Sequence, residues 1–507
     1  MLQDIALVVI KIVTHSVYSE VLSGIIASWL CWRLWTFTVL PVFQPDAPKE
    51  LPYLIPFLGH ARSFIGNSED LINRGKQYFN NNGEPFAITV GEKTLYILTE
   101  PEHVNEVYKN NTTLSWDAML NDLLIGFGIN PSIIDTLWKK MPIEIARQSR
   151  PDVDPAKVPP HLDTINASLT RSIDRHLKWS HLKARYPSLC TTRDSIRHLS
   201  LSQFCSDVLV GAVTRTFFGE KIYDIEPGLT EALQDFNTDA WMLVFQYPHG
   251  KNSRISKARR KILKAFDRTS RLPISERDDQ AWLIKTCMSE LEANGVGHED
   301  RAALALMIYW ALTLYSANIN PYKLGFWMLT YILSDPTLHA QLLAETRPAF
   351  THTHTQTDPN NPQQPQTQIN IPHLLTQTLT PLLHSTYLET LRITSGSLSA
   401  RKITHPTPIS SKILSPPHTI LLAFRQLQMD TRAFGSYPTH FDATRFLRDK
   451  SLASSLNFKP FGGGVNYCPG RFFAQQEMFV FVASVINKFE SGGGDEVYID
   501  LKRREDF

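Results

Sequence analysis

The spacing of apolar residues differs from one region of the chain to the next. Between residues 85 and 104 they alternate with polar residues on both sides of Gly91-Glu92-Lys93, which predicts a β-hairpin. From about Pro101 to Pro336 they recur every three or four positions, which predicts helices. The pattern therefore indicates a mainly α-helical protein with a smaller β-rich region near its start.

The most hydrophobic stretch of the helical region runs from Ala303 to Leu333. Asn318, Asn320 and Lys323 lie in its middle, where contact with lipid would leave polar groups unsatisfied. The stretch therefore predicts a long helix through the protein core and not a membrane span.

The amino-terminal segment has the composition of a membrane anchor. Val21 to Phe43 is 23 residues long with one charge, Arg33, and about 20 apolar residues are enough to cross a bilayer. The stretch is too long for the apolar part of a secretory signal. We predict a membrane anchor with its flank in residues 1–44; a helix buried in the protein, or one lying at the membrane interface, is the alternative.

Residues 351–368, THTHTQTDPNNPQQPQTQ, form a polar segment of low complexity. Such a composition buries too little surface to offset the entropy of ordering, so we predict a surface insertion. His352 and His354 suggest a metal site, but solvated histidines are the more common case in such segments.

Charge and cysteine content narrow the function classes. Lys and Arg total 51 against 49 for Asp and Glu, so the net charge of +2 favours no nucleic-acid partner. The five cysteines are odd in number and form no CxxC pair, which favours a reduced, cytosol-facing protein. Only Cys468 lies in a sequence that suggests chemistry.

The string FKPFGGGVNYCPGRFFAQQE surrounds Cys468. Its glycines permit backbone angles that other residues avoid and let the main chain approach a flat ligand. Pro469 and Gly470 lead into an apolar helix, whose amino terminus stabilises a thiolate at Cys468. A thiolate is a good ligand for a soft metal; a structural cysteine after a glycine turn is the alternative for the CPG tripeptide alone.

The whole string resembles the haem-binding loop of cytochromes P450. The resemblance implies that Cys468 is the metal ligand of haem, iron protoporphyrin IX. It also implies cofactor contacts from other residues, which are Phe461, Gly462, Gly464, Asn466, Gly470 and Arg401. Asn466 stands where the family commonly has an arginine or histidine that binds a haem propionate, and Arg401 matches another position that often has this role.

Two further strings appear in the order of the family. Glu389 and Arg392 are three residues apart, so they share a helix face and can pair. Arg445, in YPTHFDATRFL, matches the second arginine segment of the family. The resemblance implies that these three residues form a buried charged network that holds the loop before the cysteine.

The resemblance covers about residues 45 to 490 and implies the cytochrome P450 fold, with a large helical domain, a smaller β-rich region and a long central helix over the haem. Residues 45–507 are then the catalytic domain. The implied activity is that of a haem-thiolate monooxygenase, an oxidoreductase that inserts one atom of dioxygen into a lipophilic small molecule. A steroid, terpenoid or polyketide of secondary metabolism is the expected substrate.

The chain contains no flavin or nucleotide module, so a separate NADPH-cytochrome P450 reductase is the implied electron donor. Lys459 and Arg471 flank the cysteine loop and are candidates to face this partner, with simple solvation as the alternative. The anchor implies a location in the endoplasmic reticulum membrane, with the catalytic domain facing the cytosol.

The central helix departs from the family pattern. Most monooxygenases of the family have an acidic residue followed by threonine, whereas this chain has Ser316-Ala317-Asn318-Ile319-Asn320-Pro321. Pro321 lacks an N–H, so the carbonyl of Ala317 loses its helical partner. Ala317, Asn318 and Asn320 are therefore candidate catalytic residues that hold water, dioxygen or a substrate group; the alternative is that the asparagines only satisfy a kinked helix.

This Asn-Pro break is similar to that of the branch with bile-acid steroid hydroxylases and prostacyclin synthase, which includes peroxide isomerases. A haem-thiolate isomerase or dehydratase therefore stays an alternative, as does a haem-binding protein without turnover. Only 39 residues follow Cys468 (507 minus 468), so we expect the carboxyl-terminal β-hairpin of the family to be absent.

Overall fold

The computed structural model describes residues 19–140, 160–192, 195–244, 246–247, 249–313, 321–353, 366–396, 398–464, 467–493 and 498–504. The chain divides into two compact units. Unit 1 comprises Met1–Ser115 and Ala400–Ala423, and unit 2 comprises Trp116–Ser399 and Phe424–Phe507. Unit 1 therefore contains the predicted anchor and the predicted β-rich region.

The amino-terminal helix of unit 1 covers Ser19–Phe43 and includes a π-helical segment, Trp35–Val39, followed by α2, Leu40–Phe43. It is long and apolar enough to cross a membrane, and none of its most apolar part is buried. This exposure argues against a helix buried in the protein. Two side chains attach it to the segment that follows: Trp29 Nε1 donates to the carbonyl of Leu54 at 2.7 Å, and Arg33 donates to that of Tyr53 at 2.8 Å.

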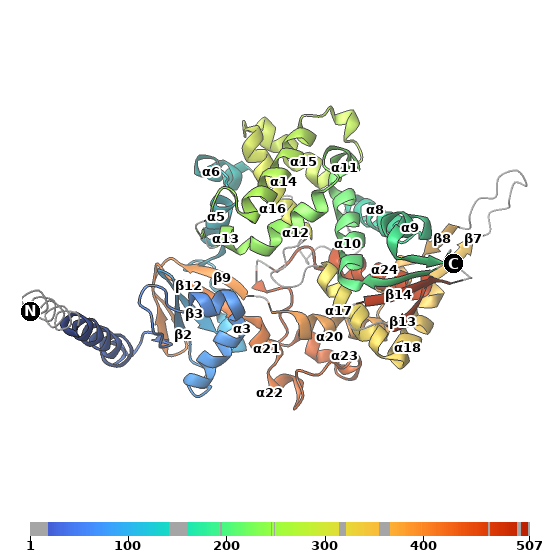
Figure 1. Cartoon of the computed structure of the whole chain (residues 1–507). Coiled ribbons are helices and arrows are strands. Elements are labelled where there is room, and N and C mark those ends of the chain that lie inside the picture. Colours follow the sequence, from blue (N-terminus) through green and yellow to red (C-terminus); the bar gives the residue numbers. More distant parts are fainter. Residues whose placement is uncertain are drawn as a thin grey trace, which may run out of the picture. The chain divides into compact units, whose positions relative to one another are not determined.

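A six-stranded sheet forms the body of unit 1, with the strands in the order β1-β2-β3-β12-β9-β4. The strands are β1 (Lys49–Glu50), β2 (Phe86–Val90), β3 (Lys93–Leu98), β12 (Thr419–Ala423), β9 (Leu398–Ile403) and β4 (Leu114–Ser115). β2 and β3 pair antiparallel around Gly91, which has a φ of +64°, so the predicted hairpin is confirmed. The helix α3 (Ala61–Tyr78) packs against β2 (Figure 1).

Two smaller elements complete unit 1. The helix α4 (Pro101–Lys109) begins with a proline, which lacks the N–H that the first helical turn leaves unbonded. The strands β10 (Thr407–Ile409) and β11 (Lys412–Leu414) form a short antiparallel hairpin.

Unit 2 is mainly helical, as the spacing of apolar residues predicts. Its helices are α5 (Trp116–Gly126), α6 (Pro131–Lys140), α8 (Pro160–His176), α9 (Trp179–Arg185), α10 (Leu201–Phe218), α11 (Lys221–Ile225), α12 (Leu229–Asp239), α13 (Trp241–Val244), α14 (Arg254–Ser270), α15 (Trp282–Ala293), α16 (His298–Thr313), α17 (Pro321–Ser334), α18 (Pro336–Thr346), α19 (Ile371–Leu375), α20 (Pro381–Thr394), α21 (Phe424–Gln428), α22 (Thr431–Phe434), α23 (Arg445–Arg448) and α24 (Arg471–Lys488).

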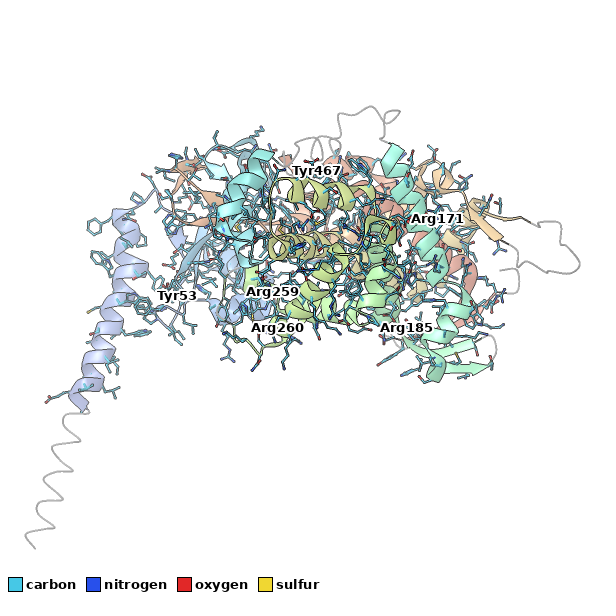
Figure 2. All side chains as sticks on the ribbon, turned by 90° about the horizontal axis from the view of Figure 1, so that it is seen from above. Tyr53, Arg171, Arg185, Arg259, Arg260 and Tyr467 are labelled. Carbon is cyan, nitrogen blue, oxygen red and sulfur yellow. The ribbon has the colours of Figure 1, made fainter. Side chains whose placement is uncertain are left out.

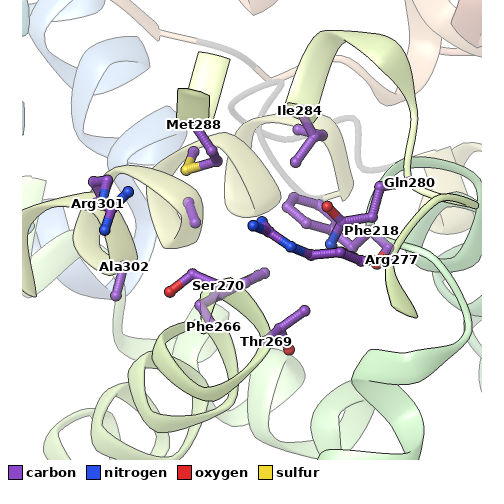
Figure 3. A pocket seen from close by; sticks show the side chains of 11 residues that line it. Phe218, Phe266, Thr269, Ser270, Arg277, Gln280, Ile284, Met288, Arg301 and Ala302 are labelled. Carbon is purple, nitrogen blue, oxygen red and sulfur yellow. Dashed lines mark hydrogen bonds between the residues drawn. The ribbon is translucent and has the colours of Figure 1, made fainter. Parts of the chain in front are cut away.

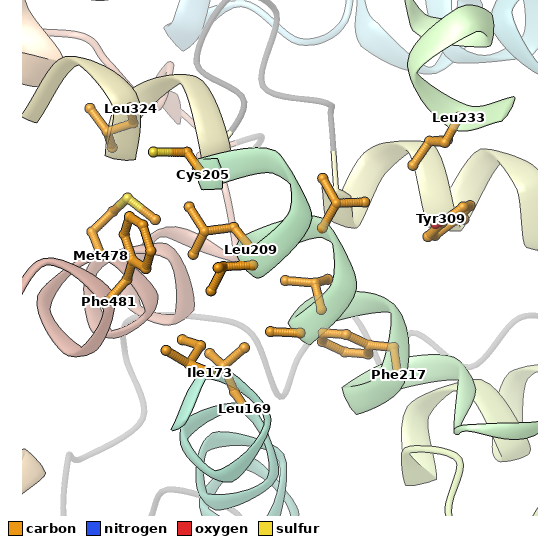
Figure 4. Packing of buried hydrophobic residues seen from close by; sticks show 14 of the residues in the cluster. Leu169, Ile173, Cys205, Leu209, Phe217, Leu233, Tyr309, Leu324, Met478 and Phe481 are labelled. Carbon is orange, nitrogen blue, oxygen red and sulfur yellow. The ribbon is translucent and has the colours of Figure 1, made fainter. Parts of the chain in front are cut away.

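The core of unit 2 is built around α10, which is buried along most of its length. Side chains from α8, α17 and α24 pack around it, as Figure 4 shows for Ile173, Leu324 and Phe481. The helix α24, which follows Cys468 in the sequence, is therefore held in the interior of the unit.

The predicted central helix lies in this core. α16 ends at Thr313 and α17 begins at Pro321, and residues 314–320 between them lie outside the described residues. Leu306 and Met328, one from each helix, are fully buried in the hydrophobic cluster. The prediction of a core helix in preference to a second membrane span is confirmed for both described parts.

The basic segment after residue 250 forms α14, whose inner face buries Ile255, Ile262 and Phe266. Arg260, labelled in Figure 2, is exposed, whereas Arg259 is half-buried and donates to the carbonyl of Phe127 at 2.8 Å. The outer face of the helix is charged and solvated.

The ends of the polar insertion are more regular than its composition suggests. β7 (Phe350–Thr353) and β8 (Gln366–Ile369) pair antiparallel, so the margins of residues 351–368 form strands; His354 lies outside the described residues. A short backbone ladder needs little apolar burial, which is why composition did not reveal it.

The expectation that the carboxyl terminus lacks a β-hairpin is wrong. β13 (Phe489–Gly493) and β14 (Tyr498–Arg503) pair antiparallel, and β14 also pairs with β6 (Ser195–Ser200), whose other neighbour is β5 (Cys190–Thr192). Ile499 and Leu501 are buried, whereas Tyr498 and Lys502 beside them are exposed.

Gly325 marks a close approach of three core helices. A Cβ on Gly325 of α17 would lie 3.0 Å from Leu209 and 3.1 Å from Phe481. We expect Gly325→Val to lower the free energy of unfolding by about 1–3 kcal/mol, because overpacking forces neighbouring side chains to move. Gly66→Val in α3, where no atom lies within 4 Å, is the control. Thermal unfolding followed by circular dichroism measures both, and equal melting temperatures would contradict the packing argument.

Candidate haem-thiolate site

Cys468 lies at the end of a closed loop directly before α24. Its backbone N–H donates to the carbonyl of Phe461 at 3.1 Å, and the N–H of Gly462 donates to that of Lys459 at 3.2 Å. Gly462 and Gly464 have φ values of +76° and +64°, a region that favours glycine. The loop therefore needs glycine at these two positions.

Gly470 caps the amino terminus of α24. A Cβ at this position would lie 3.9 Å from Cys468 Sγ, so the thiol lies close to the start of the helix. Phe461, Gly462, Gly464 and Gly470 thus gather on the cysteine loop, and their contacts with a cofactor stay predictions.

The protein environment favours the thiol form of Cys468. Burial raises the pKa of Cys468, while the backbone N–H groups of Gly470 and Arg471 and the charge of Arg471 lower it by less. The N–H groups at the start of the helix therefore favour the thiolate, as the argument from sequence expects, but desolvation is the larger effect. A coordinating metal ion deprotonates a thiol, so the thiolate at this position depends on the metal.

The donor set suits haem better than a bare metal ion. Within the described residues, no three side chains of histidine, cysteine, aspartate or glutamate gather closely enough to hold a metal. A structural zinc site needs about four protein ligands, whereas haem iron takes most of its ligands from the porphyrin and needs one axial protein ligand. A single half-buried cysteine at a glycine-rich loop therefore fits haem.

Arg471 reinforces the loop from inside. Its guanidinium donates to the carbonyl of Cys468 at 2.9 Å and lies 4.5 Å from the ring centroid of Tyr467 and 4.3 Å from that of Phe472. Tyr467 is labelled in Figure 2. Arg471 is buried, so it does not face a redox partner through solvent, and this part of the prediction is wrong. The reason is local: the cation contacts both rings and the carbonyl within the loop and the first turn of α24.

A charged network lies behind the loop. Glu389, fully buried in α20, receives a bidentate pair from Arg392: Nε donates to Oε2 at 2.8 Å and Nη2 to Oε1 at 2.7 Å. Arg445 Nε donates to the same carboxylate at 3.2 Å. The three residues that the sequence singles out are thus brought together, with one acid between two bases.

The two arginines also hold the chain between α21 and α23. Arg392 Nη1 donates to the carbonyls of Gln428 at 2.8 Å and Pro438 at 2.6 Å. Arg445 Nη1 donates to the carbonyl of Phe434 at 2.7 Å. The network therefore fixes backbone of the segment that leads to the cysteine loop.

Other predicted site residues are not placed around Cys468. Ala317, Asn318, Asn320 and Asn466 lie outside the described residues. Arg401 is buried in β9, where it donates to the carbonyl of Ala400 at 2.8 Å, and it belongs to unit 1 whereas Cys468 belongs to unit 2. The propionate role of Arg401 therefore stays a prediction.

Reasoning from sequence overlooked two buried polar side chains near the cysteine. Glu477 of α24 is fully buried, and burial raises the pKa of its carboxyl well above the usual range. Tyr387 of α20 is buried too, and this burial raises the pKa of its phenol. An acidic residue within the apolar run FFAQQEMFVF was the available signal.

A pocket lies elsewhere in unit 2, among α14, α15 and α16 (Figure 3). Apolar side chains form much of its wall together with Arg277 and Arg301, and Arg301 pairs with Glu292 at 2.9 Å. None of the predicted site residues lines it, so this pocket does not bear on the chemistry at Cys468.

Comparisons with known proteins agree with the loop and the network. A family model described as cytochrome P450 matches residues 325–496, which include Glu389, Arg392, Arg445 and Cys468. The chain is 24% identical to cytochrome P450 monooxygenase poxD of Penicillium oxalicum over 89% of each chain. It is 23% identical to cytochrome P450 monooxygenase efuG of Hormonema carpetanum over 94% of this chain and 90% of that protein. It is also 22% identical to prostacyclin synthase of Rattus norvegicus, over 86% and 85%.

Removing the carboxylate of Glu389 should lower the stability of the protein. We expect Glu389→Ala to lower the free energy of unfolding by about 3–5 kcal/mol, because it leaves Arg392 buried without its counter-charge. The exposed pair of Lys502 and Glu490 offers a control, since Glu490→Ala should cost about 1 kcal/mol or less. Chemical denaturation measures the free energy of unfolding of both variants. Similar losses in Glu389→Ala and Glu490→Ala would contradict the argument that burial makes the loss of Glu389 costly.

Proposed function

Because the chain belongs to the cytochrome P450 family and is an oxidoreductase, we propose that it is a haem-thiolate monooxygenase acting on a lipophilic small molecule. One observation carries the proposal. Cys468 is a lone candidate ligand before α24, on a loop that Arg471 and the network of Glu389, Arg392 and Arg445 support.

The residues of the loop have distinct tasks in this proposal. Cys468 would be the axial ligand of haem, and the bound haem would supply the activation of dioxygen. Gly462, Gly464 and Gly470 would let the backbone lie close to the porphyrin because they have no Cβ. Arg471 holds the carbonyl of Cys468 and so orients the ligand.

The proposal extends to residues of the central helix and to the propionates. Ala317, Asn318 and Asn320 would hold water, dioxygen or a substrate group at the break before Pro321. Arg401 and Asn466 would bind haem propionates. The support for these roles is the resemblance of their sequence positions to those of the family.

The proposed substrate is a steroid, terpenoid or polyketide of secondary metabolism. Support comes from relatives in fungi that are named monooxygenases. We further propose that residues 1–44 anchor a catalytic domain of residues 45–507 in the endoplasmic reticulum membrane, facing the cytosol. NADPH-cytochrome P450 reductase would supply the electrons, and the exposed apolar helix Ser19–Phe43 supports the anchor.

A second candidate function is a haem-thiolate isomerase. The similarity to prostacyclin synthase favours it, together with the missing acid-threonine pair in the central helix. An isomerase rearranges an oxygenated substrate and consumes no external electrons, so the electron balance separates the two functions.

Replacing the proposed ligand should remove the thiolate signature. We expect Cys468→Ser to abolish the characteristic absorption spectrum of reduced, carbon-monoxide-bound haem, because an alkoxide or neutral ligand cannot replace the thiolate. Cys190→Ser is the control, since Cys190 is also half-buried. Retention of the spectrum in Cys468→Ser would refute the ligand assignment.

Isotope labelling should identify the source of the inserted atom. With NADPH, reductase and ¹⁸O-labelled dioxygen, we expect the product to carry one labelled oxygen atom for each NADPH used productively. Mass spectrometry of the product and absorbance of NADPH measure the two quantities. Turnover without NADPH consumption and without label would favour the isomerase instead.

A further inference from the structure

Arg471 is a buried cation without a carboxylate partner. The residue is 8% exposed. It donates to the carbonyl of Cys468 at 2.9 Å but forms no ion pair within the part of the chain that the structure describes. Four other buried cations each pair with a carboxylate: Arg301, Arg392, Lys412 and Lys488. The charge of Arg471 is therefore buried without an acid to compensate it, which is costly unless another negative group does so.

Two aromatic rings lie against this cation. The guanidinium carbon is 4.5 Å from the ring centroid of Tyr467 and 4.3 Å from that of Phe472. The faces of the rings attract a cation through their quadrupole, but they supply no full negative charge. A charge that is removed from water acts more strongly on its neighbours, because the local dielectric is lower. The rings thus keep the cation in place without neutralising it.

The charge of Arg471 acts on Cys468. Burial raises the pKa of the Cys468 thiol, and the backbone N–H of Gly470 and the charge of Arg471 oppose this rise. Burial also raises the pKa of the Tyr467 phenol, and the charge of Arg471 again has the opposite effect. Among the described residues, Arg471 is the one charged side chain that acts on Cys468 in this way. The cation therefore favours negative charge on the sulfur.

We propose that Arg471 is the counter-charge of the Cys468 thiolate and, as a positioning residue, raises the reduction potential of the bound haem. The proposal rests on the proposed haem-thiolate function. Reduction transfers one electron from the reductase to ferric haem and gives ferrous haem, so the site gains one negative charge while no bond breaks. A buried positive charge beside the ligand stabilises the reduced form more than the oxidised form.

Arginine combines two properties that other side chains separate. Its planar guanidinium lies against both rings while one N–H reaches the carbonyl of Cys468. Lysine at this position would keep the charge and lose the planar group. Glutamine would keep an N–H donor and lose the charge. Comparison of the two variants therefore separates the effect of the charge from that of the hydrogen bond.

A potentiometric titration of the haem-loaded protein tests the effect of the charge. We expect Arg471→Gln to lower the ratio of ferrous to ferric haem at a fixed solution potential about tenfold, which is about 59 mV for one electron. Arg471→Lys should stay near the wild-type potential because it keeps the charge. Lys459→Gln is the matched control: it removes one positive charge that also flanks the cysteine loop, but the charge of Lys459 does not act on Cys468.

Salt and a ring variant test whether burial makes the charge effective. The difference between wild type and Arg471→Gln should persist at about 1 M salt, because a buried charge is screened much less than an exposed one. Phe472→Ala should lower the potential by a smaller amount, because water would then reach the cation. This variant keeps Arg471 and covers the case in which Arg471→Gln fails to load haem, and an unchanged potential in Phe472→Ala would then overturn the proposal.

The infrared band of carbon monoxide bound to ferrous haem reports the electron donation by the thiolate without turnover. Loss of the cation strengthens this donation and places more electron density in the antibonding orbital of carbon monoxide. We expect Arg471→Gln to move the band to lower frequency and Arg471→Lys to leave it near its wild-type position. A purely structural role would lower haem loading and change neither the band nor the potential of the loaded protein.

The two hypotheses fail in different ways. Equal potentials and equal bands in wild type and Arg471→Gln, with the thiolate spectrum present in both, would overturn the role of Arg471 and leave the monooxygenase function intact. A fall in potential in Lys459→Gln or Arg471→Lys as large as that in Arg471→Gln would also overturn it. A wild type without the thiolate spectrum would refute the ligand assignment, and both hypotheses with it.

Discussion

The charge of Glu389 inside unit 2 is the constraint on which the site depends. A carboxylate without water is stable only when opposite charges and hydrogen bonds surround it. Arg392 and Arg445 supply both, and their remaining N–H groups bind the carbonyls of Gln428, Phe434 and Pro438. The compensation of one buried charge therefore fixes the course of the chain ahead of the cysteine loop.

The same physics has the opposite result at Glu477. This glutamate is as deeply buried as Glu389, but no described basic residue reaches it, so the proton stays on the carboxyl. Two identical side chains thus have different charges because their neighbours differ. A structural ion pair and a neutral acid lie in the same unit, on α20 and α24 respectively.

Sequence patterns predicted the elements that depend on local periodicity. The hairpin of β2 and β3 and the buried course of α16 and α17 follow from the alternation and the spacing of apolar residues. The terminal hairpin was not predicted, because β14 also pairs with β6 from far earlier in the chain, as in Leu501 opposite Ile196. Such pairing leaves no local signal.

For the site, the sequence by itself determined the loop around Cys468, because positive backbone angles favour glycine. It also determined that Glu389 and Arg392 share a helix face, because three residues make nearly one helical turn. Only the tertiary structure decided that desolvation raises the pKa of Cys468, and that Glu477 lines the same void as Pro321 without a counter-charge among the described residues. The physical reason is that desolvation and charge compensation depend on neighbours from distant parts of the chain.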